Sequence, residues 1–254
     1  MNDGLFFACQ HDAVLRRFVT ARYRRASPKV ECHLVASCPL GGDGNSEPAS
    51  DLWPVQVTEE QVTNALPVRF QGGAQERWFA QARGLVEPNA VVLATASPLG
   101  VPSARTVLLK AYDDRGLVVF TNLGSRKATE ALANPYATLL FSWVELERQV
   151  VVEGRVEQVD RAETQAYFHS RPRSSQIGAW VSQQSAPIAG REVLERRQAE
   201  LELRFVGADV PVPDFWGGLR VVPTAVEFWQ GRPSRLHDRL RYRLDTGVVD
   251  RLSP

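Results

Sequence analysis

From residue 90 onward the sequence is a succession of short apolar runs, each no longer than a strand, separated by clusters of Gly, Pro, Asp and Asn. Runs of this kind, joined by tight turns, are typical of consecutive strands that pair antiparallel. They predict strands at residues 90–96, 104–112, 117–121, 136–143, 148–159, 218–222, 225–230 and 239–244. The pattern favours a small barrel over a doubly wound parallel sheet.

The strand at residues 148–159 has the clearest alternation. Val150, Val152, Gly154 and Val156 fall on one face, and mostly charged or amide side chains alternate with them. We expect the first face to lie in the core and the second to face water or a ligand.

Helix signals interrupt the strands. Ser125 is a suitable N-cap for a helix that extends through Leu132, and a longer helix rich in outer charges is predicted over residues 191–205. The expected fold class is therefore mainly β (α+β), with inserted and flanking helices.

A further helix is predicted around Tyr167. Asp160 with Glu163 resembles a capping box at its start. Pro172 cannot donate to the preceding turn and disfavours helical geometry at Arg171, so we expect a break there and a second short helix after it.

Composition excludes several classes of protein. With 44% hydrophobic residues among 254, the chain can bury a real core, and its formal net charge of +1 provides no general attraction to nucleic acid or an acidic membrane. No apolar run approaches the roughly 18 residues that a membrane-spanning helix needs. We expect neither nucleic acid nor a membrane as a partner.

The three cysteines, Cys9, Cys32 and Cys38, are an odd number near the start of the chain, which argues against a disulfide scaffold and for a reducing, cytoplasmic location. Cys32, His33 and Cys38 fit no usual zinc spacing, so no metal site is predicted.

The chain divides near residue 75. Residues 39–54 have the composition of a linker, and we expect residues 1–74 to form an N-terminal arm and linker, poorly ordered in part, before one domain at residues 75–254. Residues 15–25 are basic and fit a solvated arm, an amphipathic helix or an organelle-targeting segment.

The most distinctive local cluster is formed by Tyr167, Arg171 and Ser175, which recur every four residues. In a helix, or in two abutting helical turns, this spacing points a phenol, a guanidinium and a hydroxyl the same way. An arginine grips two phosphate oxygens and hydroxyls fill the remaining acceptor directions, so the three groups suit a phosphate monoester.

Two other segments offer cations. Ser125-Arg126-Lys127 combines a helix N-terminus with two positive charges, as an anion site does, although a surface cap followed by solvated charges has the same pattern. Arg105 and Lys110 have opposite parity on a regular strand, so a bulge, two ligands or a solvated Lys110 are all consistent with the sequence.

A second dense cluster lies near the C-terminal end. Trp229 is followed by Arg235, His237 and Arg239, which share a face if the chain is extended there. An aromatic ring beside cations suits a flat, anionic heteroaromatic ligand.

Taken in order, six motifs resemble those of the pyridoxamine 5'-phosphate oxidase family. They are Arg105-Thr-Val-Leu-Leu-Lys110, Thr121-Asn-Leu-Gly-Ser-Arg-Lys127, Glu147-Arg-Gln-Val150, Tyr167-Phe-His-Ser-Arg-Pro-Arg-Ser-Ser-Gln-Ile-Gly178, Phe215-Trp-Gly-Gly218, and Glu227-Phe-Trp-Gln-Gly231 with Arg235-Leu-His-Asp-Arg239. The resemblance extends from Glu87 to Pro254. It fades before that, because Arg16-Arg17-Phe18-Val19 lacks the tyrosine of the family's Arg-Arg-x-Tyr arm, which leaves closure of an arm over substrate open.

The resemblance implies an FMN-binding split β-barrel that works as a homodimer, with FMN at the interface. The positions that match the family's flavin-binding set are Arg105, Thr106, Val107, Leu108, Leu109, Lys110, Phe120, Thr121, Arg126, Lys127, Gln149, Gln184, Ser185, Trp229 and Arg239. Those that match its substrate-binding set are Lys110, Tyr167, Arg171, Ser175, Arg235, Leu236 and His237, and Arg235 and His237 are the expected catalytic residues.

The reaction that the resemblance implies is oxidation of pyridoxamine or pyridoxine 5'-phosphate to the aldehyde, with O2 as acceptor and H2O2 as product. Two alternatives remain: a related flavin oxidase for another aromatic metabolite, such as a phenazine precursor, and a carrier that binds flavin or pyridoxal phosphate without turnover.

Overall fold

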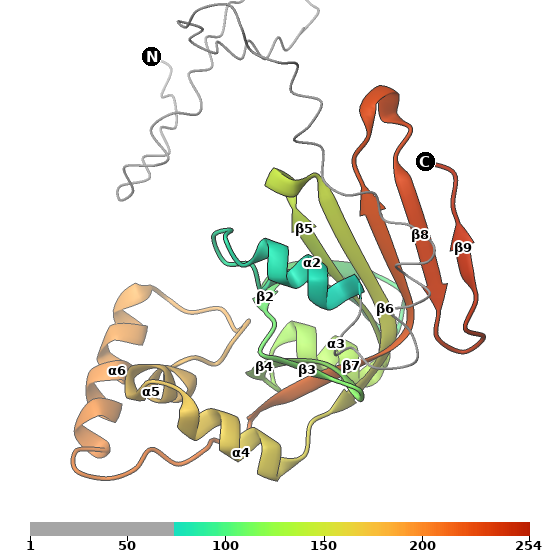
Figure 1. The fold of residues 1–254 in the computed structure, drawn as a ribbon. Helices are drawn as coiled ribbons and strands as arrows, with labels where there is room; N and C mark the ends of the chain where they lie inside the picture. The colour runs from blue at the N-terminus through green and yellow to red at the C-terminus, as the bar shows by residue number, and fades with distance from the viewer. Residues whose placement is uncertain (1–73) are drawn as a thin grey trace, which may run out of the picture. The chain divides into compact units, whose positions relative to one another are not determined.

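The computed structural model describes residues 74–254, and its centre is one antiparallel sheet of nine strands (Figure 1). The strands are β1 (Ala90–Ala96), β2 (Pro102–Leu108), β3 (Ala111–Asp113), β4 (Gly116–Asn122), β5 (Tyr136–Trp143), β6 (Arg148–Gln158), β7 (Trp216–Gln230), β8 (Asp238–Arg243) and β9 (Val249–Arg251). Their order is β2-β1-β5-β6-β7-β4-β3, with β8 on β7 and β9 on β8. The mainly β class predicted from the sequence is confirmed.

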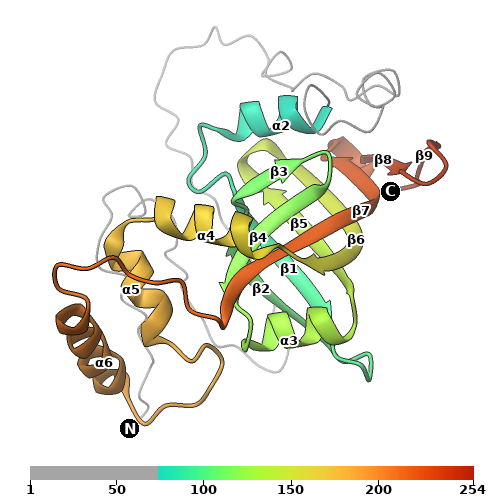
Figure 2. The same cartoon turned by 90° about the horizontal axis from the view of Figure 1, so that it is seen from below.

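In the described part of the chain, five helices accompany the sheet: α2 (Ala74–Ala82), α3 (Arg126–Ala133), α4 (Arg161–Ser170), α5 (Arg173–Val181) and α6 (Arg191–Arg204). Figure 2 shows α2 and α3 at opposite ends of the curled sheet and α4, α5 and α6 together at one side of it. Two short 3-10 turns, Val144–Leu146 and Pro233–Arg235, complete the elements.

Strand β7 splits the sheet. Its first part pairs with β4 from Trp216 to Val221, and its last part pairs with β8 from Ala225 to Gln230. Along its other edge β7 pairs with β6 over nearly its full length. Along one edge β7 thus belongs to two separate ladders, one with β4 and one with β8, and this gives the barrel its split.

The prediction of separate strands at residues 218–222 and 225–230 was wrong, because Pro223 does not end the strand. Pro223 lies opposite Gly154, where the register with β6 shifts, and a proline is tolerated at such an irregularity because no regular ladder bond is lost. A Cβ on Gly154 would lie 2.3 Å from the carbonyl oxygen of Val222, so the close approach of the two strands requires glycine.

One other expectation needs correction, and two details add to it. The strand predicted at residues 104–112 is two strands, β2 and β3, with Leu109 and Lys110 between them. Strand β9 was not predicted, since only three residues form it. Helix α6 buries none of its residues fully, although Leu194 and Leu201 pack partly against the neighbouring core.

Two hydrophobic cores lie side by side. The larger core is formed mainly by side chains of the sheet and includes Leu93, Leu139, Phe141 and Val150. The inner face predicted for residues 148–159 is therefore confirmed. The smaller one joins the three helices at the side to the start of β7 and is centred on Phe168, Ile177, Val181, Phe205, Val210 and Trp216.

The helix start and break predicted around Tyr167 are present. The Asp160 side chain accepts a hydrogen bond from the Glu163 backbone N–H at 2.8 Å, α4 ends at Ser170 with Arg171 as its C-cap, and α5 follows Pro172. The Glu163 carboxylate binds Arg220 of β7 instead of completing a capping box.

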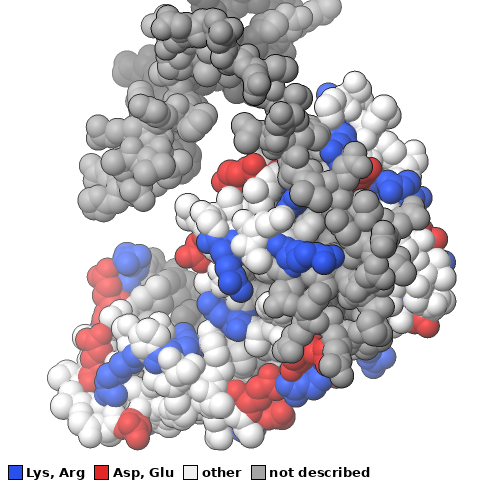
Figure 3. Space-filling view, viewed as in Figure 1, with Lys and Arg blue, Asp and Glu red and all other residues white. Residues whose placement is uncertain are grey.

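Predictions for the arm and linker, residues 15–25 and the cysteine cluster lie outside the described residues. Among the helices of residues 74–254, none is both long and apolar enough to cross a membrane. Figure 3 shows basic and acidic side chains both spread over the visible face of this part of the chain.

Candidate active site

The first part of the site is a cavity of about 340 Å³ between the start of α5 and strand β4. Tyr167, Arg171 and Ser175 line one side of it, and Lys110 and Trp216 line others. The break between α4 and α5 therefore brings the predicted phosphate-binding trio to one cavity, as the four-residue spacing requires.

Arg171 is held by aromatic rings instead of a carboxylate. Its guanidinium carbon lies 4.8 Å from the centre of the Trp216 ring, and its Nη1 atom is buried without a hydrogen-bond partner among residues 74–254. Burial lowers the pKa of Arg171 from its usual value, although the group remains a cation at neutral pH. A buried, unpartnered donor is costly, so this nitrogen is available for an anion in the cavity.

Tyr167 lies in a stack of rings. Its ring centre is 4.1 Å from that of Phe120, with an angle of 16° between the planes, and Trp216 continues the stack. Burial raises the pKa of the Tyr167 phenol, and the nearby Arg171 charge opposes that rise only in part. The phenol therefore keeps its proton at neutral pH and can donate it to an acceptor.

The second part is a larger cavity of about 900 Å³, which adjoins the first at Asn122 and Gln184. Arg126 and Ser185 lie in its wall, and the backbone N–H of Arg126 donates to Oγ of Ser185 at 3.1 Å. The start of α3 is thus turned toward a cavity, which favours the anion-site interpretation of Ser125-Arg126-Lys127 over a solvated surface cap.

Lys127 is nearly buried behind the wall shared by the two cavities. Its Nζ donates to Oε1 of Gln184 at 2.8 Å and to the hydroxyls of Thr121 and Ser125 at 3.3 and 3.4 Å. Burial, and then the charge of Arg105, lower the pKa of the ammonium. All of its hydrogen-bond partners in the described part of the chain are neutral, so a negatively charged ligand would stabilise it.

The motif from Arg105 to Lys110 divides between two environments. Val107 and Leu109 pack into the sheet core, while the side chains of Thr106 and Leu108 are exposed. Arg105 points toward α3, where it contacts Glu130. Only Lys110 of this motif lines the first cavity.

The remaining predicted residues lie elsewhere. Gln149, Trp229 and Arg239 form one row across β6, β7 and β8, and the Trp229 ring centre lies 4.6 Å from that of His237. The Arg239 Nε donates to Glu227 at 2.8 Å.

Arg235 and Leu236 are exposed at this end of the sheet. The condition under which Arg235, His237 and Arg239 would share a face is not met, because the chain is not extended at Arg235, which ends a 3-10 turn and has φ of 61°. In this tight turn the Arg232 backbone N–H donates a hydrogen bond to Nδ1 of His237 at 3.1 Å. The proton of a neutral His237 ring therefore lies on Nε2.

These two groups of residues are far apart within one chain. Phe120 pairs with Gly218 at the start of β7, while Gln149 pairs with Trp229 at its end. Eleven positions along a strand amount to roughly 36 Å of contour, and Figure 2 shows β7 running across the sheet from the side of α4 to β8. One protomer does not bring all the predicted residues together.

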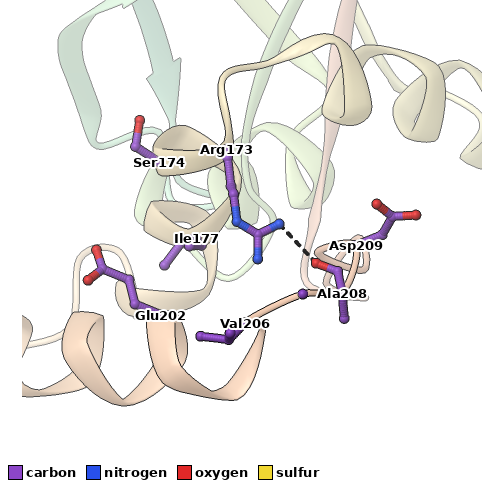
Figure 4. A pocket seen from close by; sticks show the side chains of 8 residues that line it. Arg173, Ser174, Ile177, Glu202, Val206, Ala208 and Asp209 are labelled. Carbon is purple, nitrogen blue, oxygen red and sulfur yellow. Dashed lines mark hydrogen bonds between the residues drawn. The ribbon is translucent and has the colours of Figure 1, made fainter.

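A further cavity of about 570 Å³ lies between α5 and the segment after α6 (Figure 4). Its Arg173 donates to the carbonyl oxygen of Ala208 at 2.9 Å and to that of Phe205. Glu202 and Asp209 add negative charge. Because Arg173 already donates to backbone carbonyl oxygens, this cavity is poorly suited to binding an anion.

Several residues at the site were not predicted from the sequence. Trp216, Asn122 and Ser182 line the first cavity, and Glu130 binds two of the predicted cations. Trp216 lies inside the Phe215-Trp-Gly-Gly218 motif, which could have indicated it, whereas no local signal distinguishes Glu130 from a solvated helix residue.

The sequence matches known families over most of the described part. Residues 80–205 match the family described as "Pyridoxamine 5'-phosphate oxidase", and residues 216–254 match "Pyridoxine 5'-phosphate oxidase C-terminal dimerisation region".

Similar proteins from several bacteria are named pyridoxine/pyridoxamine 5'-phosphate oxidase. The protein from Salinispora arenicola (strain CNS-205) is 57% identical over 215 residues, which cover 82% of this chain and 94% of that protein. The protein from Rubrobacter xylanophilus (strain DSM 9941 / JCM 11954 / NBRC 16129 / PRD-1) is 62% identical over 178 residues, covering 69% and 80%.

Solved structures share the fold. PhzG from Burkholderia lata 383, in complex with tetrahydrophenazine-1-carboxylic acid, aligns with a TM-score of 0.70 at 30% identity over 78% of this chain and 98% of its own. A pyridoxamine 5'-phosphate oxidase-related, FMN binding protein from Nostoc punctiforme PCC 73102 aligns at 0.59 and 17% identity over 76% and 100%, and shows the fold alone. With the split sheet, the cavity around Arg171 and these matches together, the chain belongs to the pyridoxamine 5'-phosphate oxidase family.

Proposed function

We propose that this protein is an FMN-dependent oxidase that converts pyridoxamine 5'-phosphate and pyridoxine 5'-phosphate to pyridoxal 5'-phosphate. Dioxygen is the electron acceptor and is reduced to H2O2; the amine substrate also consumes water and releases ammonia. The observation that carries the proposal is the cavity in which Tyr167, Arg171 and Ser175 converge, with a buried donor of Arg171 left unpartnered.

The proposed role of this trio is to hold the substrate phosphate. Arg171 supplies charge and a planar pair of donors, and Tyr167 and Ser175 supply hydroxyls without further charge. Lys110 lines the same cavity and adds a second cation. Fixing the phosphate orients the pyridine ring, and orientation of this kind is a large source of rate enhancement in a reaction between two bound molecules.

The residues present fit a flavin mononucleotide. The α3 N-terminus, the outward side chain of Arg126 and the ammonium of Lys127 could bind its phosphate monoester. The partners of Lys127 in the described residues are all neutral. When bound, FMN supplies a hydride acceptor and a route for electrons to O2. Phe120, Thr121 and Gln184 line the adjoining wall of the first cavity.

The rest of the flavin and substrate sets would come from a second copy of the chain. Gln149, Trp229, Arg239, Arg235 and His237 lie at the far end of β7 from Lys127. A two-fold dimer places such an end against the cavity of its partner, and residues 216–254 match a dimerisation region. In this arrangement Arg235 would contact the substrate and the Nε2–H of a neutral His237 would donate to it.

A single anaerobic experiment tests the proposal. The full-length protein, loaded with FMN and freed of oxygen, is mixed with pyridoxine 5'-phosphate while the flavin absorbance near 450 nm is followed. We expect bleaching, and return of the colour with stoichiometric H2O2 when air is admitted. Binding without bleaching would identify a carrier instead of an oxidase.

The same experiment addresses the phenazine alternative, which the 30% identity to PhzG keeps relevant. A dihydro- or tetrahydrophenazine carboxylic acid that bleaches the flavin where pyridoxine 5'-phosphate does not would overturn the proposed substrate. The higher identity to the pyridoxine/pyridoxamine 5'-phosphate oxidases favours the phosphorylated pyridine.

A further inference from the structure

Glu130 is a carboxylate that the fold buries among donors. Its side chain on α3 is 8% exposed, and it accepts hydrogen bonds from the Thr95 hydroxyl at 2.6 Å and from the Ser103 hydroxyl. The Nε of Arg126 donates to its other oxygen at 2.7 Å, and Arg105 approaches at 3.5 Å. One carboxylate therefore joins β1, β2 and α3 and contacts two cations of the predicted flavin set.

The carboxylate is the close hydrogen-bond partner of Arg126 and one of several groups that hold Arg105. Arg105 also donates to the Leu93 carbonyl oxygen at 3.1 Å and to Thr95 at 2.6 Å, so its guanidinium is fixed in place at the base of α3. Arg126 is held through Nε alone, and its side chain, 59% exposed, reaches the wall of the larger cavity. The terminal nitrogens of Arg126 are thus directed outward by a contact at the other side of its guanidinium.

The donors also keep Glu130 ionised. Hydrogen bonds from Ser103 and Thr95, followed by that from Arg126, lower the pKa of the Glu130 carboxyl to about 2. At neutral pH it is a fixed negative charge, so it cannot shift to a neutral form when a ligand arrives.

We propose that Glu130 is a positioning residue for the flavin phosphate: it directs Arg126 and helps to hold Arg105, so that the start of α3 receives a phosphate monoester dianion. This inference rests on the proposed function, since the ligand is the phosphate of FMN. Arg105, Arg126 and Lys127 with Glu130 leave two formal positive charges at the helix start. A phosphate monoester carries about −1.5 to −2 at neutral pH, so the charges are matched.

Geometry and charge act in opposite directions here. A negative charge near the phosphate repels it, and a neutral residue at position 130 would strengthen FMN binding if charge alone mattered. Loss of the Glu130 contacts frees Arg126 and removes one of the contacts that hold Arg105, and binding weakens if the placement of these arginines matters more. The inference states that placement dominates.

The test compares FMN with riboflavin, which has the same ring system and no phosphate. Flavin-free full-length protein is titrated with each ligand, and dissociation constants are obtained from quenching of flavin fluorescence. Glu130→Gln removes the charge in nearly the same shape, and Glu130→Asp keeps the charge but is one methylene too short to reach its donors. Glu195→Gln on α6, whose carboxylate pairs with Arg191 at the surface, is the matched control.

For Glu130→Gln and Glu130→Asp we expect the dissociation constant of FMN to rise about tenfold, the size of effect expected when a charge-assisted hydrogen bond no longer fixes its partner. That of riboflavin should change by less than about twofold, and Glu195→Gln should match the wild type for both ligands.

Three outcomes would overturn the inference. Tighter FMN binding in Glu130→Gln would show that charge dominates. An unchanged constant in Glu130→Asp would show that reach is irrelevant. An equal loss for FMN and riboflavin, with a lower melting temperature, would show that Glu130 only stabilises the fold. If the wild type binds FMN no better than riboflavin, the proposed phosphate site itself fails. If the wild type prefers FMN but the Glu130 variants behave in one of the three ways above, only the role of Glu130 fails.

Discussion

At the scale of single residues, the site depends on cations whose environments differ. Arg171 rests on the face of Trp216 with one donor unpartnered, Arg126 is half exposed at a helix start, and Lys127 is nearly buried among neutral partners. Burial removes water from a charge and raises the free energy of the charged form. Lys127 is therefore the cation most sensitive to pH.

We predict that FMN affinity depends on the charge of Lys127 at alkaline pH. The ammonium is charged below its pKa and neutral above it, and burial lowers that pKa from 10.5, so the charge is lost at lower pH than in an exposed lysine. The ratio of FMN to riboflavin affinity in the wild type should fall as pH rises from 7 toward 10. Lys127→Arg should keep a flatter ratio, because a guanidinium stays protonated throughout.

Fluorescence titrations at several pH values measure this ratio, in which changes of the shared flavin ring cancel. A ratio that falls equally in the wild type and in Lys127→Arg would assign the pH dependence to another group.

At the scale of elements, α4 carries Tyr167 and is fastened to the sheet by Arg220 of β7. The Arg220 side chain is 3% exposed and donates to both Glu163 oxygens at 2.8 Å and to Asp113 at 2.9 Å. Buried Phe168, the residue directly after Tyr167, packs in the smaller core beneath the same helix. This ion-pair network therefore helps to set where the phenol enters the cavity.

We predict that Arg220→Ala lowers the free energy of unfolding by about 3 kcal/mol, the lower end of the range for breaking a buried ion pair, because its carboxylate partners are partly exposed. Arg241→Ala, which removes a more exposed pair with Glu153, should change it by no more than about 0.5 kcal/mol. Urea denaturation measures both. If the free energy of unfolding falls by similar amounts in the two variants, the Arg220 network stabilises the fold no more than a surface ion pair does.

At the scale of the whole molecule, the predicted site residues form two groups at opposite ends of β7. A ligand that contacts both groups needs a second protomer, since the strand between them is extended. The half of β7 that pairs with β4 borders the first cavity, whereas the half that pairs with β8 holds Trp229 opposite Arg239.

A mixing experiment follows from this division. Lys127→Ala and Arg239→Ala should each be nearly inactive as homodimers. After joint refolding in equal amounts, half of the dimers are mixed, and each mixed dimer holds one intact site composed of wild-type Lys127 from one chain and wild-type Arg239 from the other. We expect recovery of about one quarter of the wild-type specific activity under random assortment. No recovery, despite mixed dimers detected by mass spectrometry of tagged chains, would mean that each site lies within one chain.

The sequence by itself determined the mainly β class, most strand positions, the Asp160 cap, the break at Pro172 and the common direction of Tyr167, Arg171 and Ser175. Each of these depends on residues within a few positions of one another, where backbone geometry alone sets spacing and direction. The tertiary structure decided the rest: that β7 passes through Pro223 unbroken, that α6 lies at the surface, and that Arg235 leaves the extended face. It also decided that Glu130 meets Thr95 and Ser103, which are 35 and 27 positions away. Such contacts follow from strand register and helix docking, and these are set by how the whole chain buries its apolar surface, which no short segment specifies.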